Sequence, residues 1–520
     1  MSEYDIVPYV GGVFEDTHPD NLRSLALLFG VDAPPARTAR VLELGCSHAA
    51  NLLPLAVQLP EAEFVGVDFS EVQIAMGREH IAEVGAQNIT LRHANIADID
   101  ASWGVFDYII CHGVYSWVPS EVQQAILRVC RENLSANGVA YVSYNVLPGW
   151  YQRLPIRDLM LSHTRNFDDP QTRINQSRAI LEFLSERNVD SSQPFSVLAR
   201  AINESLQSHH DSYIFHEYLA THNEPVYFEE FARRADKAGL QYLAECDFPS
   251  MLAENFDEKA RAILNQISGI VRTEHYMDFL RNRTFRKTLL VKAERDIDRK
   301  LSGEKMRQFR IGCNYAVVQE DDEERPWSLD DREPMKFRGE NDVGFFASAR
   351  IIKAALVHLA QEFPETLSFD EMLSWARERI DSDAPLEADA SLLADNLLTC
   401  MAKGFVHIRT EPSPFKNSVS EKPVSWGYAR WQAREGDLVT TLQHRKCRLA
   451  ELDAVLLRAM DGSRDREALV DEAQAAIDRG EVQVRWEGPE VTDPEHLRGV
   501  IRAATLQHLQ HLARLALVEG

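Results

Sequence analysis

VLELGCSHAAN, at residues 41–51, decides how the first half of this chain folds. Its apolar opening is typical of a buried strand, Gly45 permits a tight reversal, and small residues at 47 and 49 let a ligand approach the backbone. A second predicted strand ends in Asp68, where an acid in a nucleotide-binding sheet accepts a hydrogen bond from a ribose hydroxyl. For residues 41–51 alone, the alternative is an ordinary strand-to-helix turn. Taken with Asp68, the stretch predicts a site for a nucleoside-bearing cofactor.

Around this turn a short apolar strand, a turn and a helical pattern repeat, which is typical of parallel βα units. Five parallel strands are expected, at 40–44, 63–68, 89–94, 106–112 and 138–145. Two later strands, at 239–248 and 285–293, are candidates to close the sheet as an antiparallel pair. A helical insertion at about 151–230 follows the fifth strand and is a candidate lid, because open α/β sheets hold ligands at their carboxyl edge.

Two serines have the spacing of helix N-terminal caps. Ser70 stands three residues before Gln73, and Ser120 three before Gln123. In such a capping box the serine hydroxyl accepts from a free backbone amide of the first turn. Both are expected to begin a helix of the sheet.

Composition excludes several classes of protein. The 520 residues are 45% hydrophobic and 26% charged, close to the globular average, so the chain is neither disordered nor membrane-embedded. Lys and Arg number 56 against 80 Asp and Glu, and a net charge of -24 repels phosphate backbones, so no nucleic-acid partner is expected. The seven cysteines form no C-x-x-C pair, and the N-terminus lacks the basic and apolar regions of a signal peptide. We therefore expect a cytoplasmic protein without membrane insertion.

The second half is expected to be mainly helical. An acidic stretch at 317–334 is expected to form a solvated linker or surface loop. Two later portions each have the order helix, turn, helix, loop, helix, strand, which suggests two winged-helix-like units; a duplication is left open. Such units often bind DNA, but their acidic charge here favours protein docking. The expected domains are a cofactor-binding core at 1–150, a helical insertion with the closing strands at 151–295, a first winged-helix-like domain with the acidic linker at 296–415, and a second at 416–520.

The sequence of the turn also excludes some classes of cofactor. Nicotinamide sites use G-x-G-x-x-G, whereas residues 45–50 are GCSHAA, and no P-loop Gly-Lys-Ser/Thr is present. An acid two residues before the glycine, Glu43, resembles motif I of class I S-adenosylmethionine (SAM)-dependent methyltransferases. The resemblance implies a Rossmann-like, seven-stranded sheet, SAM as cofactor and S-adenosyl-L-homocysteine as product.

The same resemblance assigns cofactor contacts. In that family the glycine loop holds the methionine portion, the acid after strand two binds ribose, residues after strand three meet adenine, and residues after strand four approach the methyl group. The corresponding residues are Glu43, Gly45, Cys46, Ser47 and Ala49 for the loop, Asp68 and Phe69 for ribose, Asn95 and Ile96 for adenine, and His112 and Gly113 near the sulfonium. Two depart from the family pattern: Ala49 stands where glycine is usual, and Asn95 where many relatives have aspartate. If the loop requires a left-handed residue at 49, alanine is strained there.

Longer stretches narrow the resemblance further. Residues 4–30, 112–119, 141–150 and 223–245 are similar to bacterial protein lysine methyltransferases that act on outer-membrane proteins and carry a helical methyltransferase regulatory region. This implies a protein acceptor, such as an outer-membrane or other secreted protein before export, and allows a homodimer. It also implies an N-terminal cap over the cofactor, formed by Tyr4, Pro8, Tyr9, Thr17 and His18.

A lysine acceptor requires a mouth at which its ammonium loses a proton, because only the neutral amine has a lone pair. HGVYSWV follows the fourth strand and brings His112, Tyr115 and Trp117 to this mouth, where aromatic faces guide a cation and an imidazole or oxygen takes a proton. Asn145 and Trp150 follow the fifth strand and share the mouth. In the alternative interpretation the aromatic residues only pack, and His112 is hydrogen-bonded in a turn.

Two other functions stay open. One is a small-molecule methyltransferase whose C-terminal half serves oligomerisation, and the other is a non-catalytic regulatory or scaffolding protein, motivated by Ala49. The histidines at 209, 210, 216 and 222, with Glu217, match no ligand spacing, so no metal site is expected. Cys46 is expected to be a small buried residue, because methyl transfer from SAM needs no protein nucleophile.

Overall fold

The computed structural model describes residues 7, 11–187, 192–317, 329, 333–339, 344–483 and 493–519. The chain divides into two compact units, the first comprising 1–12 and 31–297 and the second 13–30 and 298–520. Among the described residues, no helix is both long and apolar enough to cross a membrane.

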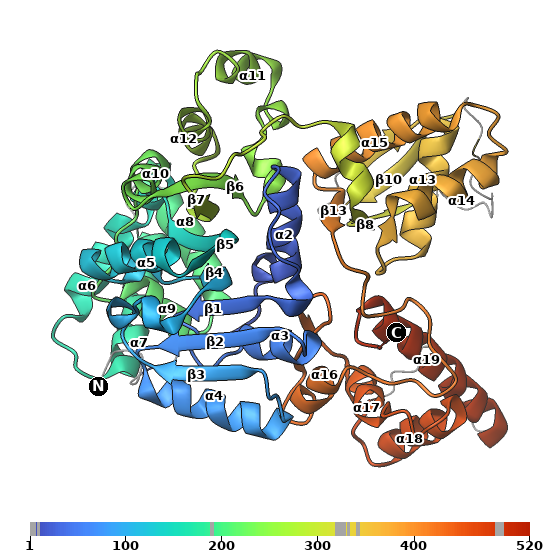
Figure 1. Cartoon of the computed structure of the whole chain (residues 1–520). Coiled ribbons are helices and arrows are strands. Elements are labelled where there is room, and N and C mark those ends of the chain that lie inside the picture. The colour runs from blue at the N-terminus through green and yellow to red at the C-terminus, as the bar shows by residue number, and fades with distance from the viewer. Residues whose placement is uncertain are drawn as a thin grey trace. The chain divides into compact units, whose positions relative to one another are not determined.

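The first unit is built on a seven-stranded sheet with the order β3-β2-β1-β4-β5-β7-β6 (Figure 1). The strands from β1 to β5 pair in parallel, and β7 lies antiparallel to both β5 and β6. The expected Rossmann-like sheet with an antiparallel closing pair is therefore confirmed. The strands are β1 Arg40–Leu44, β2 Glu63–Asp68, β3 Ile89–His93, β4 Phe106–Cys111, β5 Leu134–Asn145, β6 Leu240–Glu245 and β7 Phe285–Lys292.

Helices of this unit follow the strands, as the alternating pattern predicts. They include α3 Leu52–Gln58, α4 Glu71–Val84, α5 Ser120–Glu132, α10 Phe228–Lys237, α11 Glu258–Leu264 and α12 Ile270–Arg281. Ser70 caps α4 as expected, its hydroxyl accepting from the Gln73 amide at 3.2 Å. The matching expectation for Ser120 is wrong: Ser120 is the first residue of α5, because the loop ends one residue earlier at Pro119, whose carbonyl accepts the first helical bonds.

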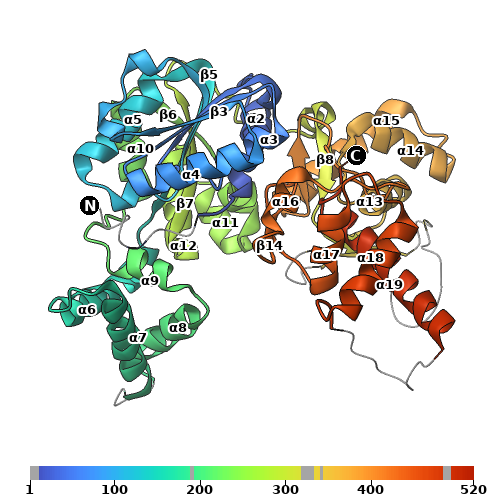
Figure 2. The same ribbon diagram turned by 90° about the horizontal axis from the view of Figure 1, so that it is seen from below.

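The described residues of the first unit include two separate hydrophobic clusters. One lies against the sheet and includes Ile126 of α5 with Phe231 and Ala235 of α10, all buried beside strand residues. The other belongs to the helical insertion, where Phe215 and Tyr218 pack among apolar residues of four helices. These helices are α6 Leu154–Thr164, α7 Pro170–Arg187, α8 Pro194–Gln207 and α9 Asp211–Tyr218, and they form a group projecting from the sheet (Figure 2). The insertion therefore has a core of its own.

The second unit is mostly helical, with three small antiparallel sheets. Its first group contains β8 Arg310–Cys313, β9 Tyr315–Val317, β10 Met335–Gly339, β11 Gly344–Ala347, α13 Arg350–Gln361, β12 Leu367–Ser368, α14 Phe369–Ile380, α15 Leu386–Ala402 and β13 Val406–Arg409. Its second group contains α16 Gly427–Gln432, β14 Leu438–Thr440, β15 Lys446–Arg448, α17 Glu451–Ala459, α18 Arg466–Asp478 and α19 Pro494–Arg514. Most of the acidic stretch 317–334 lies outside the described residues.

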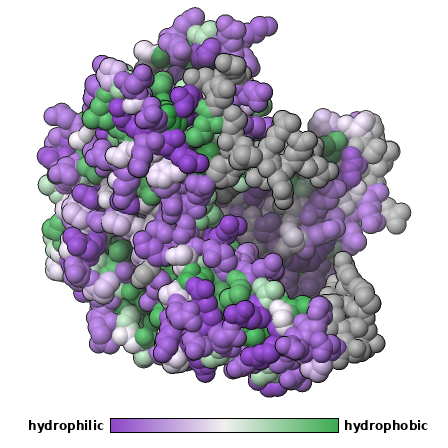
Figure 3. Space-filling model, turned by 90° about the vertical axis from the view of Figure 1, so that its right-hand side faces the viewer, coloured by the Kyte–Doolittle hydropathy of each residue, from purple (hydrophilic) through white to green (hydrophobic). Residues whose placement is uncertain are grey.

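Helix α2, Pro19–Leu28, belongs to the second unit although it precedes β1 in sequence. Buried Asp20 accepts from the backbone amide of Thr410, which follows β13. The sequence pattern did not predict this long-range contact. The surface seen in Figure 3 is mostly hydrophilic, with hydrophobic residues in small separate groups, as expected for a chain of which 26% is charged.

Candidate active site

The glycine loop joins β1 to α3 and is held in a tight conformation. The backbone amides of Gly45 and Cys46 both donate to the Val67 carbonyl, at 2.8 and 3.0 Å. Gly45 has φ +76°, and a β-carbon there would lie 2.4 Å from Val114 Cγ2, so only glycine fits. Ala49 is fully buried and also left-handed, with φ +63°. Alanine pays about 1–2 kcal/mol for that conformation.

Asp68 ties the loop to the end of β2. Its Oδ2 accepts from the Ser47 amide at 2.8 Å, and its Oδ1 from the Ser70 amide at 2.9 Å. A carboxylate oxygen accepts more than one hydrogen bond, so these two bonds leave the carboxylate able to accept from a ligand as well. The carboxylate predicted to bind ribose therefore also shapes the loop beside it.

Glu43 places a buried carboxyl beneath the loop, with its side chain only 3% exposed. Its Oε1 accepts from Asn51 Nδ2 at 2.9 Å, while Oε2 has no hydrogen-bond partner among the described residues. The pKa of Glu43 is raised to about 8, mainly by burial and to a smaller extent by the negative charge of Asp68, while the hydrogen bond from Asn51 opposes the rise. A buried oxygen without a partner is costly, so this position favours a ligand that brings a donor or a cation.

Other loop residues form a network that reaches the N-terminal segment. Ser47 Oγ donates to Gln73 Oε1 at 3.0 Å, and His48 Nδ1 lies 3.1 Å from the same oxygen. Gly11 approaches the loop so closely that a β-carbon there would lie 2.6 Å from His48 Cε1. The thiol of Cys46 is buried, and burial raises its pKa well above the usual range, so it is not a thiolate nucleophile.

The predicted N-terminal cap is only partly described. Tyr4, Pro8 and Tyr9 lie outside the described residues. Thr17 and His18 belong to the second unit, where His18 Nδ1 accepts from the Asp20 amide and caps α2. Burial lowers the pKa of His18 to about 3, so the ring is neutral there.

The residues predicted to contact ribose and adenine differ in exposure. Phe69 is 62% exposed beyond β2, and Ile96 is buried after β3. Asn95 Oδ1 accepts from the Ala97 amide at 2.9 Å and begins a short 3-10 turn at Ile96–Asp98. One lone pair of this oxygen is therefore used by the turn, and one remains.

His112 and Gly113 follow β4 and are anchored by β5. His112 Nδ1 lies 2.8 Å from the Tyr141 hydroxyl, and the two rings stack with their centroids 5.8 Å apart. The Gly113 amide donates to Ser143 Oγ at 2.8 Å. These contacts fix the imidazole and the backbone at the carboxyl edge of the sheet.

Tyr115 lies in the core. Its ring is fully buried, with centroids 5.2 Å from Phe231 and 5.9 Å from Tyr144, and burial raises the pKa of its hydroxyl. This position matches the packing interpretation of Tyr115 and gives its ring no opening toward a substrate.

Trp117, after β4, lies close to Asn145 and Trp150, which belong to the end of β5 and the turn after it; Trp150 and Asn145 are buried and Trp117 is half-buried. The two tryptophan rings meet edge to face, with centroids 6.1 Å apart. Asn145 Nδ2 donates to Asn223 Oδ1 at 3.2 Å, and the Asn145 backbone amide donates to Ser116 Oγ at 2.9 Å. Sequence reasoning did not single out Asn223 as a site residue, although it begins the stretch NEPVYF.

No metal centre is evident in the described part of the chain, where no three His, Cys, Asp or Glu side chains cluster suitably. His216 Nε2 instead lies 2.8 Å from the Val7 carbonyl. Glu217 is close to Arg153 and Arg157; burial raises its pKa to about 7 and the two guanidinium groups oppose that rise.

Three family models match the chain. Residues 41–138 match a methyltransferase domain, 210–292 a predicted methyltransferase regulatory domain, and 421–517 the PKMT C-terminal winged helix domain. The sheet order and the glycine loop agree with the first of these matches. The protein is therefore a class I SAM-dependent methyltransferase, with SAM as its methyl donor.

Whole-length relatives define its family. An uncharacterised protein of Rickettsia prowazekii (strain Madrid E) is 36% identical over 503 residues, which cover 95% of this chain and 90% of that protein. The structure of PKMT2 from Rickettsia typhi in complex with AdoHcy superposes with a TM-score of 0.89 at 30% identity, covering 99% of this chain and 100% of that one. A second uncharacterised Rickettsia prowazekii protein is 40% identical over 240 residues, 46% of this chain and 96% of its own length. The chain belongs to this family of methyltransferases with a regulatory region and a PKMT winged-helix domain.

Proposed function

We propose that this enzyme transfers the methyl group of SAM to the side-chain amine of lysine in a protein. The observation that supports it best is the whole-length similarity to PKMT2. Trp117, Asn145 and His112 are the proposed lining of the acceptor mouth, because the loop after β4 lies against the glycine loop at Val114 and Gly45. We also propose that the acceptor is an outer-membrane or other secreted protein before export, and that transfer takes place in the cytoplasm. A homodimer is part of the same proposal.

The residues around the glycine loop suit SAM. The unpartnered Glu43 oxygen fits the ammonium of the methionine portion, and the Asp68 carboxylate at the end of β2 is the proposed acceptor for the ribose hydroxyls. Asn95, Ile96 and Phe69 are proposed to border the adenine. When bound, SAM supplies a methyl group on a sulfonium, which is electrophilic without help from a protein nucleophile.

At the mouth, the protein's task is to bind the lysine, exclude water and accept a proton. The half-buried Trp117 is the proposed aromatic contact for an approaching ammonium, and the buried Trp150 holds the Trp117 ring edge to face. Asn145 is 4% exposed and held by Asn223, so its carbonyl oxygen is a fixed acceptor for an amine N–H. His112 is held by Tyr141 and is the proposed proton acceptor at this edge.

The test is methyl transfer from tritiated SAM into proteins of a cell extract, followed by identification of the labelled residue. We expect label on lysine side chains of polypeptide. Label in small metabolites would instead support a small-molecule methyltransferase. Binding of SAM with no labelled acceptor of either kind would contradict the proposal and favour a regulatory protein.

A further inference from the structure

A cavity of about 530 Å³ opens at the carboxyl edge of the sheet, beside β6, α12 and β7. Its lining includes three cationic side chains, Arg281, Arg283 and Lys287, and the carbonyl-bearing turn at Ser250. The volume lies within the range of ligand sites in proteins. The cavity is separate from the glycine loop and the predicted cofactor residues.

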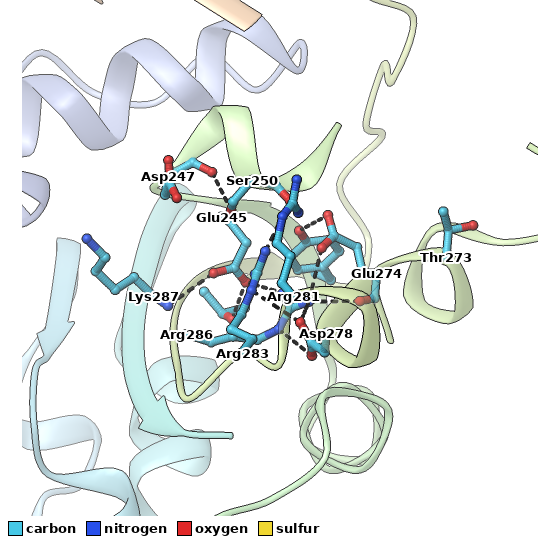
Figure 4. A network of polar contacts seen from close by, with 12 residues as sticks. Glu245, Asp247, Ser250, Thr273, Glu274, Asp278, Arg281, Arg283, Arg286 and Lys287 are labelled. Atoms are coloured by element: carbon cyan, nitrogen blue, oxygen red, sulfur yellow. Dashed lines mark hydrogen bonds and ion pairs between the residues drawn. The ribbon is translucent and has the colours of Figure 1, made fainter. Parts of the chain in front are cut away.

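Glu245, which also lines the cavity, and two acidic side chains of α12 are paired with one buried arginine (Figure 4). Arg286 is fully buried and forms ion pairs with Glu245, Glu274 and Asp278 at 2.7, 3.0 and 2.8 Å. Glu245 also accepts from Thr288 Oγ1 at 2.6 Å. All three carboxylates pair with Arg286, and among them Asp278 also pairs with Arg283.

Two guanidinium groups point at one neutral oxygen in the cavity wall. Arg281 and Arg283 extend side by side and both donate to the Ser250 carbonyl (Figure 4). Arg283 also pairs with Asp278, at 3.2 Å, whereas Arg281 forms no ion pair with a described carboxylate and instead lies over the Phe256 ring at 4.2 Å. The exposed Asp247 also lines the cavity but forms no ion pair within the described part of the chain. Burial, and after it the charge of Arg283, lowers the pKa of Arg281, whereas the negative charges of Glu274, Asp247 and Asp278 oppose this shift.

The cavity shares a wall with the proposed acceptor mouth. Phe285 lines the cavity, pairs with Asn145 across β7 and β5, and meets the His112 ring with centroids 6.0 Å apart. The Gly149 amide donates to the Arg283 carbonyl at 3.1 Å, and a β-carbon at 149 would lie 2.4 Å from that oxygen. A chain segment lying across Phe285 would therefore reach both sites.

An exposed apolar strip lies along α12, the helix whose last residue, Arg281, lines the cavity. Tyr276, Phe279 and Leu280 are 46%, 51% and 55% exposed, and Tyr227 stacks on Phe279 with centroids 5.8 Å apart. Tyr151, which follows the mouth residue Trp150, is 51% exposed and contacts Tyr227 edge to face. Contiguous exposed apolar side chains mark surfaces that bind other proteins. A free small anion would leave this strip uncovered.

We propose that the cavity binds a carboxylate side chain of the acceptor polypeptide, close to the lysine that is methylated, and that the α12 strip covers apolar neighbours of that carboxylate. This inference rests on the proposed function and adds a sequence preference to it. A guanidinium group binds a carboxylate through two parallel hydrogen bonds, so Arg281 and Arg283 complement an acidic side chain of the acceptor in charge and in geometry.

Peptide binding tests the inference without requiring catalysis. The probe is a fluorescein-labelled, lysine-centred peptide pool with Glu at randomised flanking positions, compared with a pool carrying Gln there, in the presence of S-adenosylhomocysteine. We expect the full chain to bind the Glu pool about tenfold more tightly, and the variant Arg281→Gln/Arg283→Gln to lose this difference. The matched control is Arg261→Gln/Arg272→Gln, which removes two exposed arginines of α11 and α12 outside the cavity and should keep it.

Several outcomes would overturn the inference. Equal binding of the Glu and Gln pools would do so, as would loss of the Glu preference in the control variant. Inorganic phosphate that displaced the labelled peptide as effectively as unlabelled peptide does would also contradict it. Because the two arginines hold Ser250, Lys287→Gln is measured as well, and it should lower the Glu preference without unfolding the turn. Methyl transfer to the same peptides separates the two proposals: transfer without a Glu preference contradicts the cavity assignment alone, whereas Glu-dependent binding with no labelled lysine contradicts the proposed acceptor.

Discussion

Glu43→Gln tests the buried carboxyl beneath the glycine loop. The pKa of Glu43 rises from 4.5 to about 8 on folding, so the folded unit holds a proton that the unfolded chain has released. Stability from this group is therefore complete below about pH 4.5 and is lost as pH rises toward 8, at about 1.4 kcal/mol per pH unit. Between pH 5 and 7.5 the free energy of unfolding of the wild type should therefore fall by about 3 kcal/mol more than that of the glutamine variant.

The assay is native-state hydrogen exchange of the β1 amides at the two pH values, because two units make a single melting temperature ambiguous. The control is Glu79→Gln on α4, whose carboxylate is exposed. Binding provides a second readout: if Glu43 meets the ligand ammonium, the wild type should release close to one proton per S-adenosylhomocysteine bound at pH 7, and the variant almost none. Parallel stability profiles for wild type and Glu43→Gln would refute the reasoning.

Three further predictions concern other parts of the chain. Ala49→Gly should raise the free energy of unfolding of the first unit by about 1 kcal/mol, measured by hydrogen exchange, because glycine adopts φ +63° without strain; no gain would mean that the loop is not left-handed there. Trp117→Ala should lower kcat/KM for a protein acceptor at least about tenfold while the Kd for S-adenosylhomocysteine stays within twofold; a matching loss of cofactor affinity would place Trp117 at the cofactor. The 2.7 Å contact with Asp453 raises the pKa of His508, so the charged pair stabilises α17 and α19 at low pH, and this stabilisation is lost as pH rises through the pKa of His508. Asp453→Asn should therefore flatten the pH dependence of hydrogen exchange in these two helices. An unchanged slope would contradict this.

Strands were the most predictable part of the fold. The ranges expected for β1 and β2 match the structure, because short apolar runs between turn residues leave few alternatives for a buried parallel strand. The start of β5 was missed: pairing begins at Leu134, where a polar stretch with a glycine gives no strand pattern. The placement of α2 in the second unit also had no local signal, since it depends on the contact between Asp20 and Thr410, nearly four hundred residues away.

Candidate site residues could be placed together from the sequence where a motif fixes the backbone. Gly45 and Asp68 were identified from spacing, and the structure brings them to one loop. Tyr115 illustrates the limit of this reasoning, because a loop aromatic next to a predicted mouth turns inward, and only packing against Phe231 determines that. No sequence motif marks Arg281 and Arg283, because what brings them together is a hydrogen bond from each to the Ser250 carbonyl, about thirty residues earlier in the chain.

Calorimetric titration of S-adenosylhomocysteine into wild type, Asp68→Ala and the exposed control Glu79→Ala measures most directly whether the glycine loop and Asp68 form the cofactor site. Loss of hydrogen bonds to a charged acceptor should weaken binding to Asp68→Ala by about ten- to hundredfold, with Glu79→Ala unchanged. Wild-type affinity in Asp68→Ala would contradict the account.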